Sequence, residues 1–317
     1  MDNLYIGIDT SCYTTSVACI QGESIVSDER TVLSVPFGEK GLRQSEILFR
    51  HNRNFPDLLR RLFERIDPER IAGVGVSQTP TEDPDSYMPA FLAGISVAEA
   101  IAGSRHVPLF RGTHQQMHIR AALLGNPELM QEERFLAFHV SGGTTDLLEV
   151  GMHDGCLAGI RRIGMSTDLH AGQLVDRIGV KLGCTFPCGP ALEKIAVQAE
   201  EKLLKVPSSV RGTDCSLSGA ESMLQRLSEK EKGSEIAYAV YDCLSRTFSK
   251  MLLSAREQTS CEKVLMAGGV SSSRILKDMM RERLDGRISV YSGRPELSTD
   301  NAVGTALLAR DALCQKQ

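Results

Sequence analysis

The sequence lacks paired cysteine motifs, a long apolar helix and the pattern of a signal peptide. Its nine cysteines contain no Cys-X-X-Cys pair, so no paired zinc motif is expected and the thiols are expected to be reduced. The most apolar helix expected, over about Met88–Gly103, is too short to span a bilayer and contains Glu99. The chain leads at once into a strand, so no signal peptide is expected. Together these absences predict a cytoplasmic protein with no membrane partner.

The chain also has little net charge. Thirty-six Lys and Arg residues against 40 Asp and Glu residues give a formal charge of -4, so no overall basic excess indicates nucleic-acid binding. A local patch remains compatible with this balance. Such charges usually form a solvated face, but one modest cluster on the first long helix is a candidate for nucleic-acid contact: Arg43, Arg50, Arg53, Arg60 and Arg61. The length of 317 residues allows two domains.

The stretch Val140–Asp146 organises the rest of the chain. It joins two apolar runs, Phe135–Phe138 and Leu147–Val150, through a Gly-Gly pair, which predicts a tight hairpin. On its own this pattern is typical of a plain turn. Glycines and hydroxyl side chains in such a turn can also bring backbone N–H groups against a phosphate.

The same order of elements occurs twice. Near the N-terminus, Leu4–Asp9 and Ser16–Ile20 flank another turn rich in Ser and Thr. Further on, Ile71–Ser77 resembles Val264–Ser271, each a strand that leads to a polar turn and a helix. The repetition predicts a duplicated α/β unit with a ligand between two hairpins that face each other.

Two histidines stand one helical turn apart. His114 and His118, at positions i and i+4 of an expected helix, share one face and could bind one metal. Two ligands are incomplete, and a pair of surface or capping histidines is the alternative. Gln115 stands where a zinc protease has its glutamate, which argues against protease chemistry. Asp300 either caps the last helix or supplies the missing oxygen ligand.

The remaining candidates lie in the second half of the chain. Gly268 and Gly269 precede a helix, where a nucleotide could approach the backbone, although ordinary strand–turn–helix packing is the favoured explanation when this segment is taken alone. Asp176 sits in a helix expected over 168–183 and is by itself a solvated carboxylate. Another helix is expected to run to about Leu203, and long helices over 46–66, 234–259 and 302–314; Pro56 should start or kink the first of these. Residues 207–222 show no clear pattern.

Taken in order, the motifs resemble the TsaD/Gcp family of tRNA threonylcarbamoyladenosine synthases. The resemblance covers nearly the whole chain and rests on the ordered set rather than on any one member: Gly7-Ile8-Asp9-Thr10-Ser11-Cys12, His114 with His118, Val140-Ser141-Gly142-Gly143, Ala171-Gly172 with Asp176, Pro187-Cys188-Gly189-Pro190, Met266–Ser271 and Ser298-Thr299-Asp300-Asn301. It implies the duplicated actin-like ATPase fold of the sugar kinases, with two lobes around a central cleft. Residues 1–108, completed by 300–317, are expected to form one lobe, and 109–299 the other.

The resemblance also implies site residues and ligands. His114, His118 and Asp300 would hold one divalent metal, iron or zinc. The phosphate or acyl end of an adenine nucleotide or adenylate would lie along Val140, Ser141, Gly142, Gly143 and Thr144, with Asp176 and Gly189 near the ribose or adenine and Gly268, Gly269 and Ser273 closing over the nucleoside. The implied reaction transfers a threonylcarbamoyl group from its adenylate to an adenosine of tRNA, with partner subunits of the modification complex.

Several positions depart from the family pattern. Thr144 replaces a histidine, Gln173 a glutamate, and Ser273 an asparagine that contacts the nucleoside. Asp168-Leu169 replaces a pair of aspartates, and Thr81–Pro84 a Gly-Pro-Gly loop. These changes leave two alternatives to the enzyme: a diverged paralogue that binds nucleotide and regulates a partner, and, ranked last, a small-molecule kinase in which the histidine pair has no role.

Overall fold

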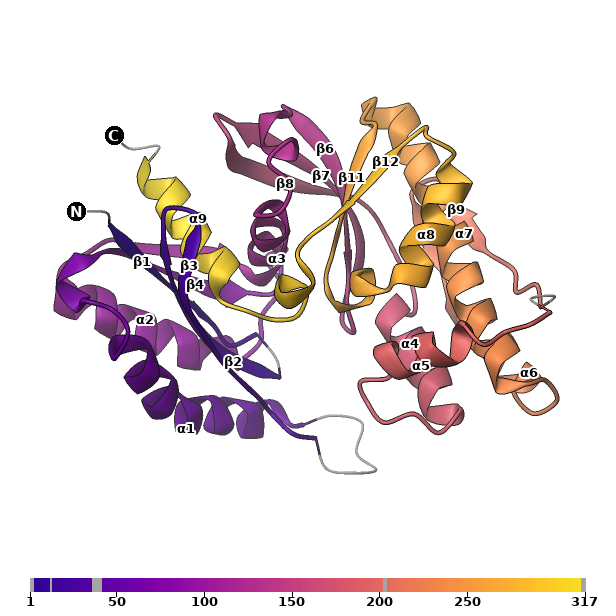
Figure 1. Cartoon of the computed structure of the whole chain (residues 1–317), viewed down its shortest axis with the longest axis horizontal. Coiled ribbons are helices and arrows are strands. Elements are labelled where there is room, and N and C mark those ends of the chain that lie inside the picture. The colour runs from indigo at the N-terminus through magenta and orange to yellow at the C-terminus, as the bar shows by residue number, and fades with distance from the viewer. Residues whose placement is uncertain (1–2, 12, 36–41, 202–203, 315–317) are drawn as a thin grey trace. The chain divides into compact units, whose positions relative to one another are not determined.

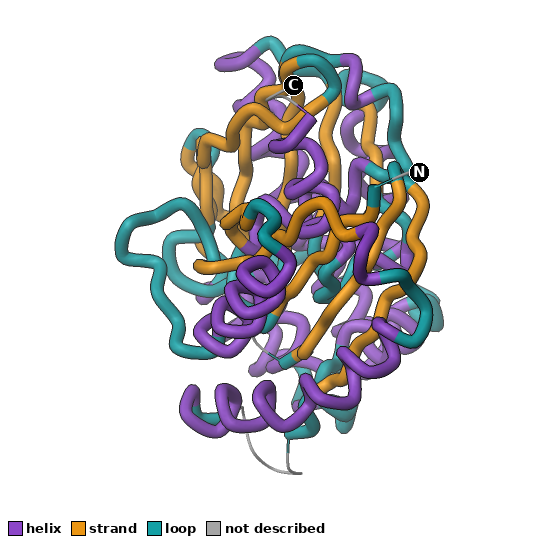
Figure 2. Tube along the Cα trace, turned by 90° about the vertical axis from the view of Figure 1, so that its left-hand side faces the viewer, coloured by secondary structure: helices purple, strands orange, loops and turns teal. Residues whose placement is uncertain are grey.

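A computed structural model describes residues 3–11, 13–35, 42–201 and 204–314 (Figure 1). Cys12 and the end expected for a helix at Leu203 lie outside the described residues. The chain divides into two compact units, Met1–Leu124 with Thr299–Gln317, and Gly125–Ser298. Each unit contains a sheet and helices; Figure 2 shows the strands in orange and the helices in purple.

The first unit has a five-stranded sheet in the order β3-β2-β1-β4-β5. Strands β1, β4 and β5 are parallel, and β2 and β3 continue the sheet as antiparallel neighbours. The strands are β1 (Leu4–Asp9), β2 (Thr14–Gln21), β3 (Ser24–Val32), β4 (Ile71–Thr79) and β5 (Leu109–Thr113). The helices are α1 (Gln44–Phe63), α2 (Phe91–Arg105), α3 (His114–Leu123) and α9 (Val303–Cys314), with a 3-10 turn η1 (Pro68–Arg70).

Alternation along β1 assigns the two faces of this sheet. Ile6 and Ile8 join a core with Leu58 of α1 and Ala98 of α2. Gly7 belongs to the opposite face of the sheet, on which α9 packs. A Cβ on Gly7 would lie 2.0 Å from the Ala302 carbonyl oxygen. The missing side chain in β1 therefore lets α9 approach the sheet, as Figure 1 shows, with α1 and α2 on the opposite face.

The second unit repeats this arrangement. Its sheet has the order β12-β11-β6-β7-β8, with β6, β11 and β12 parallel and β7 and β8 antiparallel. The strands are β6 (Arg134–Val140), β7 (Thr145–His153), β8 (Cys156–Met165), β11 (Lys263–Ala267) and β12 (Ser289–Ser292), with a small ribbon of β9 (Ser209–Arg211) and β10 (Asp214–Ser216). The helices are α4 (Ala171–Lys181), α5 (Gly189–Ala196), α6 (Ser218–Leu227), α7 (Gly233–Thr259) and α8 (Arg274–Leu284), with 3-10 turns η2 (Leu129–Gln131), η3 (Gly269–Ser272) and η4 (Pro295–Leu297).

The duplication expected from the sequence is confirmed in detail. The hairpin β1–β2 corresponds to β6–β7, and β4 holds the place in its sheet that β11 holds in the other. The apolar side of α7 lies in the core of the second unit, with Phe138 and Phe248 in ring contact at 4.5 Å between centroids.

The structure differs from the sequence-based expectation in several boundaries. Residues 109–124, expected in the second lobe, belong to the first unit because β5 pairs with β4 and α3 packs on α9. Helix α5 ends at Ala196 rather than near Leu203. Helix α1 begins at Gln44 and continues through Pro56, so the proline does not start it. Residues 207–222 contain β9, β10 and the start of α6. Among the described residues, no helix combines the length and apolar content needed to cross a membrane.

Candidate metal centre and nucleotide loops

The first unit gathers polar side chains where its parallel strands end. Strand β1 ends at Asp9, and β5 ends at Thr113, from which the chain passes directly into α3. A capping box starts this helix: the Thr113 hydroxyl accepts the Gln116 N–H at 3.1 Å, and the Gln116 side chain accepts the Thr113 N–H at 2.9 Å. The helix therefore begins at His114, and His118 follows one turn later on the same face.

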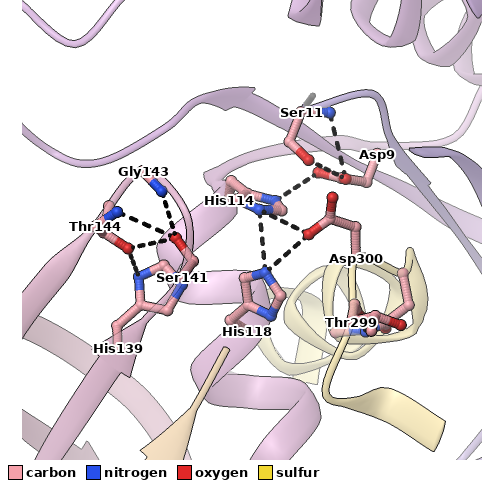
Figure 3. Close-up of polar contacts among 12 residues, drawn as sticks. Asp9, Ser11, His114, His118, His139, Ser141, Gly143, Thr144, Thr299 and Asp300 are labelled. Atoms are coloured by element: carbon pink, nitrogen blue, oxygen red, sulfur yellow. Dashed lines mark hydrogen bonds and ion pairs between the residues drawn. The ribbon is translucent and has the colours of Figure 1, made fainter. Parts of the chain in front are cut away.

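His114, His118 and Asp300 converge in the first unit (Figure 3). The two Nε2 atoms lie 3.0 Å apart, and Oδ1 of Asp300 lies 3.5 Å from Nε2 of His114 and 3.3 Å from Nε2 of His118. With metal–ligand bonds of about 2.1 Å, ligand atoms lie about 3.0 Å apart in an octahedral site and about 3.4 Å apart in a tetrahedral one. The donor set and its spacing therefore fit a divalent metal.

Asp9 lies behind the first histidine. Its Oδ1 is 3.1 Å from Nδ1 of His114, and its Oδ2 accepts the Ser11 hydroxyl at 2.9 Å. A carboxylate on the far nitrogen of an imidazole fixes the orientation of a metal ligand. Sequence reasoning did not select Asp9 as a site residue. Its position at the carboxyl end of a parallel strand was the available signal.

The charges of this cluster are strongly coupled. Burial lowers the pKa of His114, but Asp9 and Asp300 outweigh it and raise that pKa to about 10. Burial and the neighbouring His114 hold the pKa of His118 below its usual value. Burial opposes ionisation of Asp300, yet hydrogen bonds to the two histidines hold the pKa of its carboxyl well below the ordinary range. Without a metal, a proton on His114 thus balances part of the carboxylate charge.

Helix α9 places Asp300. The side chain of Asn301 accepts the N–H groups of Val303 at 3.0 Å and Gly304 at 3.4 Å, so Asn301 caps the helix. Of the two interpretations of Asp300, the capping one is therefore wrong: its carboxylate points to the histidines. Buried Arg120 of α3 donates to Asp311 of α9 at 2.6 Å, which ties the two helices together.

In the second unit, the expected hairpin is confirmed. Val140 pairs with Thr145, so Ser141–Thr144 form a four-residue turn, closed by the Ser141 N–H donating to the Thr144 carbonyl at 3.0 Å. The Ser141 hydroxyl oxygen accepts the N–H groups of Gly143 and Thr144 at 3.2 and 3.1 Å. Gly142 and Gly143 are exposed, with no atom within 4 Å of the place where a Cβ would stand.

The other predicted nucleotide residues fall into two groups. Because β6 and β11 are neighbours, Gly268 lies against the Val140 carbonyl, and Gly269 follows it into η3. Asp176 accepts the Cys188 N–H at 2.8 Å, next to Gly189, and burial raises the pKa of this carboxyl. The structure thus brings the hairpin turn together with Gly268, and Asp176 with the start of α5.

Two departures from the family pattern have local structural roles. The Ser273 hydroxyl accepts the Leu276 N–H at 3.3 Å and caps α8, so this side chain is engaged by its own helix. The Gln173 side chain accepts the His170 N–H at 3.2 Å at the start of α4. At both positions the side chain present therefore supports the start of a helix, α8 or α4.

Solved structures similar to this chain share its fold. HypF of T. kodakarensis matches with a TM-score of 0.64 at 13% identity, covering 99% of this chain and 48% of that one. Component A of the (R)-2-hydroxyglutaryl-CoA dehydratase of Acidaminococcus fermentans matches at 0.58 and 16%, covering 98% and 99%. A ROK family glucokinase from Streptomyces griseus matches at 0.52 and 13%, covering 97% and 99%. With the repeated sheet order, these neighbours confirm the expected actin-like ATPase and sugar-kinase fold.

Sequence relatives of this chain include proteins named tRNA N6-adenosine threonylcarbamoyltransferase. The protein named tRNA N6-adenosine threonylcarbamoyltransferase from Desulforapulum autotrophicum is 28% identical over 342 residues, covering 98% of this chain and 96% of its own. The protein of that name from Methanopyrus kandleri is 27% identical over 304 residues, covering 93% and 84%. The family model TsaD, described as tRNA N6-adenosine threonylcarbamoyltransferase, matches residues 43–307. A match of this extent, together with the fold and the motifs in their order, shows that this chain belongs to the TsaD family.

Proposed function

We propose that this chain is an acyltransferase that moves a threonylcarbamoyl group from its adenylate to an adenosine of tRNA. The observation that carries the proposal is the convergence of His114, His118 and Asp300, with donor atoms 3.0–3.5 Å apart, in a member of this family. The relatives' printed name supplies the reaction and the tRNA substrate. Such a substrate supports a cytoplasmic location.

The three residues would hold one divalent metal, and a mixed set of imidazoles and a carboxylate suits zinc or iron. When bound, such a metal supplies Lewis-acid polarisation of a carbonyl oxygen. The chain's own contribution is to orient the ligands. Asp9 accepts from His114 and fixes its ring, and Asn301 holds the turn from which Asp300 projects.

The second unit would bind the adenine nucleotide or adenylate. In this proposal the phosphate or acyl end lies along Val140, Ser141, Gly142, Gly143 and Thr144, where the exposed glycines leave the backbone open. Asp176 and Gly189 would be near the ribose or adenine, and Gly268, Gly269 and Ser273 near the nucleoside. Partner subunits of the modification complex are also part of the proposal.

The first test is calorimetric titration of the full-length protein with ATP, before and after metal removal, with metal content measured on the same sample. We expect stoichiometric metal in the purified protein and stoichiometric binding of ATP. Removal of the metal should weaken the binding of ATP. A transfer assay with tRNA and partner proteins then compares the unchanged chain with His114→Ala. His153→Ala is the matched control, because that histidine side chain is 77% exposed on β7.

Loss of transfer in His114→Ala with normal transfer in His153→Ala would support the enzyme. Unchanged transfer in His114→Ala would overturn the role of the metal centre. Tight nucleotide binding without any transfer, even with partner proteins supplied, would overturn the acyltransferase and point to a nucleotide-binding regulatory paralogue.

A further inference from the structure

In the second unit, a chain of polar groups runs inward from the Ser141–Thr144 turn. The Ser141 hydroxyl oxygen lies 2.8 Å from the Thr144 hydroxyl oxygen, which lies 3.2 Å from Nδ1 of His139 (Figure 3). His139 is only 2% exposed, whereas Thr144 is partly open to solvent. The chain therefore connects a buried imidazole on β6 to the turn that the proposed ligand would touch.

The direction of the first hydrogen bond follows from counting donors and acceptors. A hydroxyl has one hydrogen and two lone pairs. The Ser141 oxygen already accepts the N–H groups of Gly143 and Thr144. Its hydrogen must therefore donate to the Thr144 oxygen, which keeps one lone pair and its own hydrogen.

Two arrangements remain at Thr144. If Nδ1 of His139 carries no proton, the Thr144 hydroxyl donates to it, and its hydrogen points into the protein. If Nδ1 carries a proton, the imidazole donates to the Thr144 oxygen, and the Thr144 hydrogen is free to point outward. The proton on His139 thus decides whether the turn offers a hydroxyl donor to an anion.

The His139 ring is held by its neighbours between the Ser141–Thr144 turn and Gly268. A Cβ at Gly268 would lie 3.2 Å from Cδ2 of His139 and 2.5 Å from the Val140 carbonyl oxygen, so the ring packs directly on Gly268. Asp146 of β7 is the register partner of His139 and is 4% exposed, so a carboxylate stands on the same face. Asp146 also acts electrostatically on His170 before α4, and the β11 partner of His139 is the uncharged Ala267.

We propose that Thr144 supplies the anion-binding hydroxyl of this turn and that His139 is the positioning residue that turns it outward. When an anionic ligand binds, Nδ1 of His139 is protonated from solvent. The resulting N–H group donates a hydrogen bond to the Thr144 oxygen. The Thr144 hydroxyl then donates to the ligand. This inference rests on the proposed function for the place of the ligand, but the arrangement belongs to this chain, in which Thr144 replaces the family's histidine.

The test is nitrogen-15 NMR of the full-length protein with labelled histidines, titrated with ATP. The His139 signals are assigned by their loss in His139→Gln. We expect Nδ1 of His139 to change from an unprotonated acceptor to a protonated donor as ATP binds. In Thr144→Val, ATP should bind about tenfold more weakly or worse, the loss typical of one hydrogen bond to a charged group, and Nδ1 should stop responding. Thr144→Ser should restore both.

Thr185→Val is the matched control, because it makes the same Thr-to-Val substitution at an exposed position of the same unit. It should leave both readouts unchanged. A silent His139 during ATP binding, or full affinity in Thr144→Val, would overturn this inference alone. Absence of ATP binding by the unchanged chain would overturn the nucleotide part of the proposed function and this inference with it.

Discussion

Nδ1 of His114 lies 3.1 Å from Oδ1 of Asp9, and the two residues are 105 positions apart in the chain. Asp9 ends β1 and His114 follows β5, two parallel strands on either side of β4. The carboxyl ends of parallel strands meet at one edge of a sheet, which brings the pair together. The strand order of the first unit thus supports the candidate metal centre.

Asp9→Asn should weaken metal binding about 10- to 100-fold, because the neutral amide no longer raises the basicity of the His114 ring. Competition with a chromophoric chelator measures the affinity. Ser11→Ala removes only a hydroxyl on the other oxygen of Asp9 and should have a smaller effect. Equal metal affinity in Asp9→Asn and the unchanged chain would show that Asp9 does not support the ligand.

Gly304→Ala should separate α3 from α9. A Cβ at this position would come within 2.1 Å of the Met117 carbonyl oxygen, so the helices must move apart and Asp300 must move from the histidines. We expect a loss of about 1–3 kcal/mol in the free energy of unfolding and weaker metal binding. Gly103→Ala is the control, because nothing lies within 4 Å of its Cβ position in α2. That change should raise the stability by up to about 1 kcal/mol.

Arg120→Met tests the buried ion pair between α3 and α9. The Arg120 side chain is fully buried and contacts Asp311 at 2.6 Å, so its removal leaves a carboxylate with less compensation. Because Arg310 also contacts Asp311, we expect the free energy of unfolding to fall by about 3 kcal/mol, the low end for breaking a buried ion pair. Denaturant unfolding gives the value. Arg105→Met, which removes the surface pair with Glu69, should shift the midpoint much less; comparable shifts would contradict the role given to burial.

Asp168 should make the stability of the second unit depend on pH. Its carboxylate accepts the serine hydroxyls of Ser216 and Ser218 and the N–H of Leu217 at 2.8 Å. Burial opposes ionisation, but these hydrogen bonds outweigh it and hold the pKa of Asp168 well below its usual value. The folded state thus has the lower pKa, and the stabilisation is present above about pH 4 and lost as the pH falls below it.

Asp168→Asn should therefore lower the free energy of unfolding by about 1 kcal/mol at neutral pH. The difference in this free energy from the unchanged chain should shrink below about pH 4. Unfolding by denaturant at several pH values measures this. Asp154→Asn, at a side chain that is 86% exposed, should show no such trend. A difference that is constant from pH 7 to pH 3 would mean that the charge of Asp168 contributes nothing.

Arg53 is one exposed candidate for contact with tRNA in the arginine cluster on α1. Arg50, Arg60 and Arg61 are paired with carboxylates, while the guanidinium of Arg53 stacks on the exposed Phe49 ring at 5.8 Å. Replacing Arg50 and Arg53 together with Ala should weaken tRNA binding and lower the slope of log affinity against log salt by about one per lost phosphate contact. Arg256→Ala on α7 is the control. Unaltered affinity and slope would exclude this cluster as the tRNA site.

The sequence by itself determined the local features of this protein. The apolar alternation of β1, the Gly-Gly turn between β6 and β7 and the four-residue spacing of His114 and His118 are set by neighbouring residues, because strands and helices have fixed periods. The duplication was visible for the same reason. The residues alone left Asp300 either as a helix cap or as a third ligand. The resemblance to a family selected the ligand role, since periodicity says nothing about residues distant in the chain.

The tertiary structure decided what depends on distant contacts. Only the strand order β1-β4-β5 brings Asp9 to His114, and only the packing of α9 on α3 turns Asp300 to the histidines while Asn301 takes the cap. The same packing puts residues 109–124 in the first unit. The link from Thr144 to His139 also needed coordinates, because the direction of a hydroxyl depends on every donor and acceptor around it.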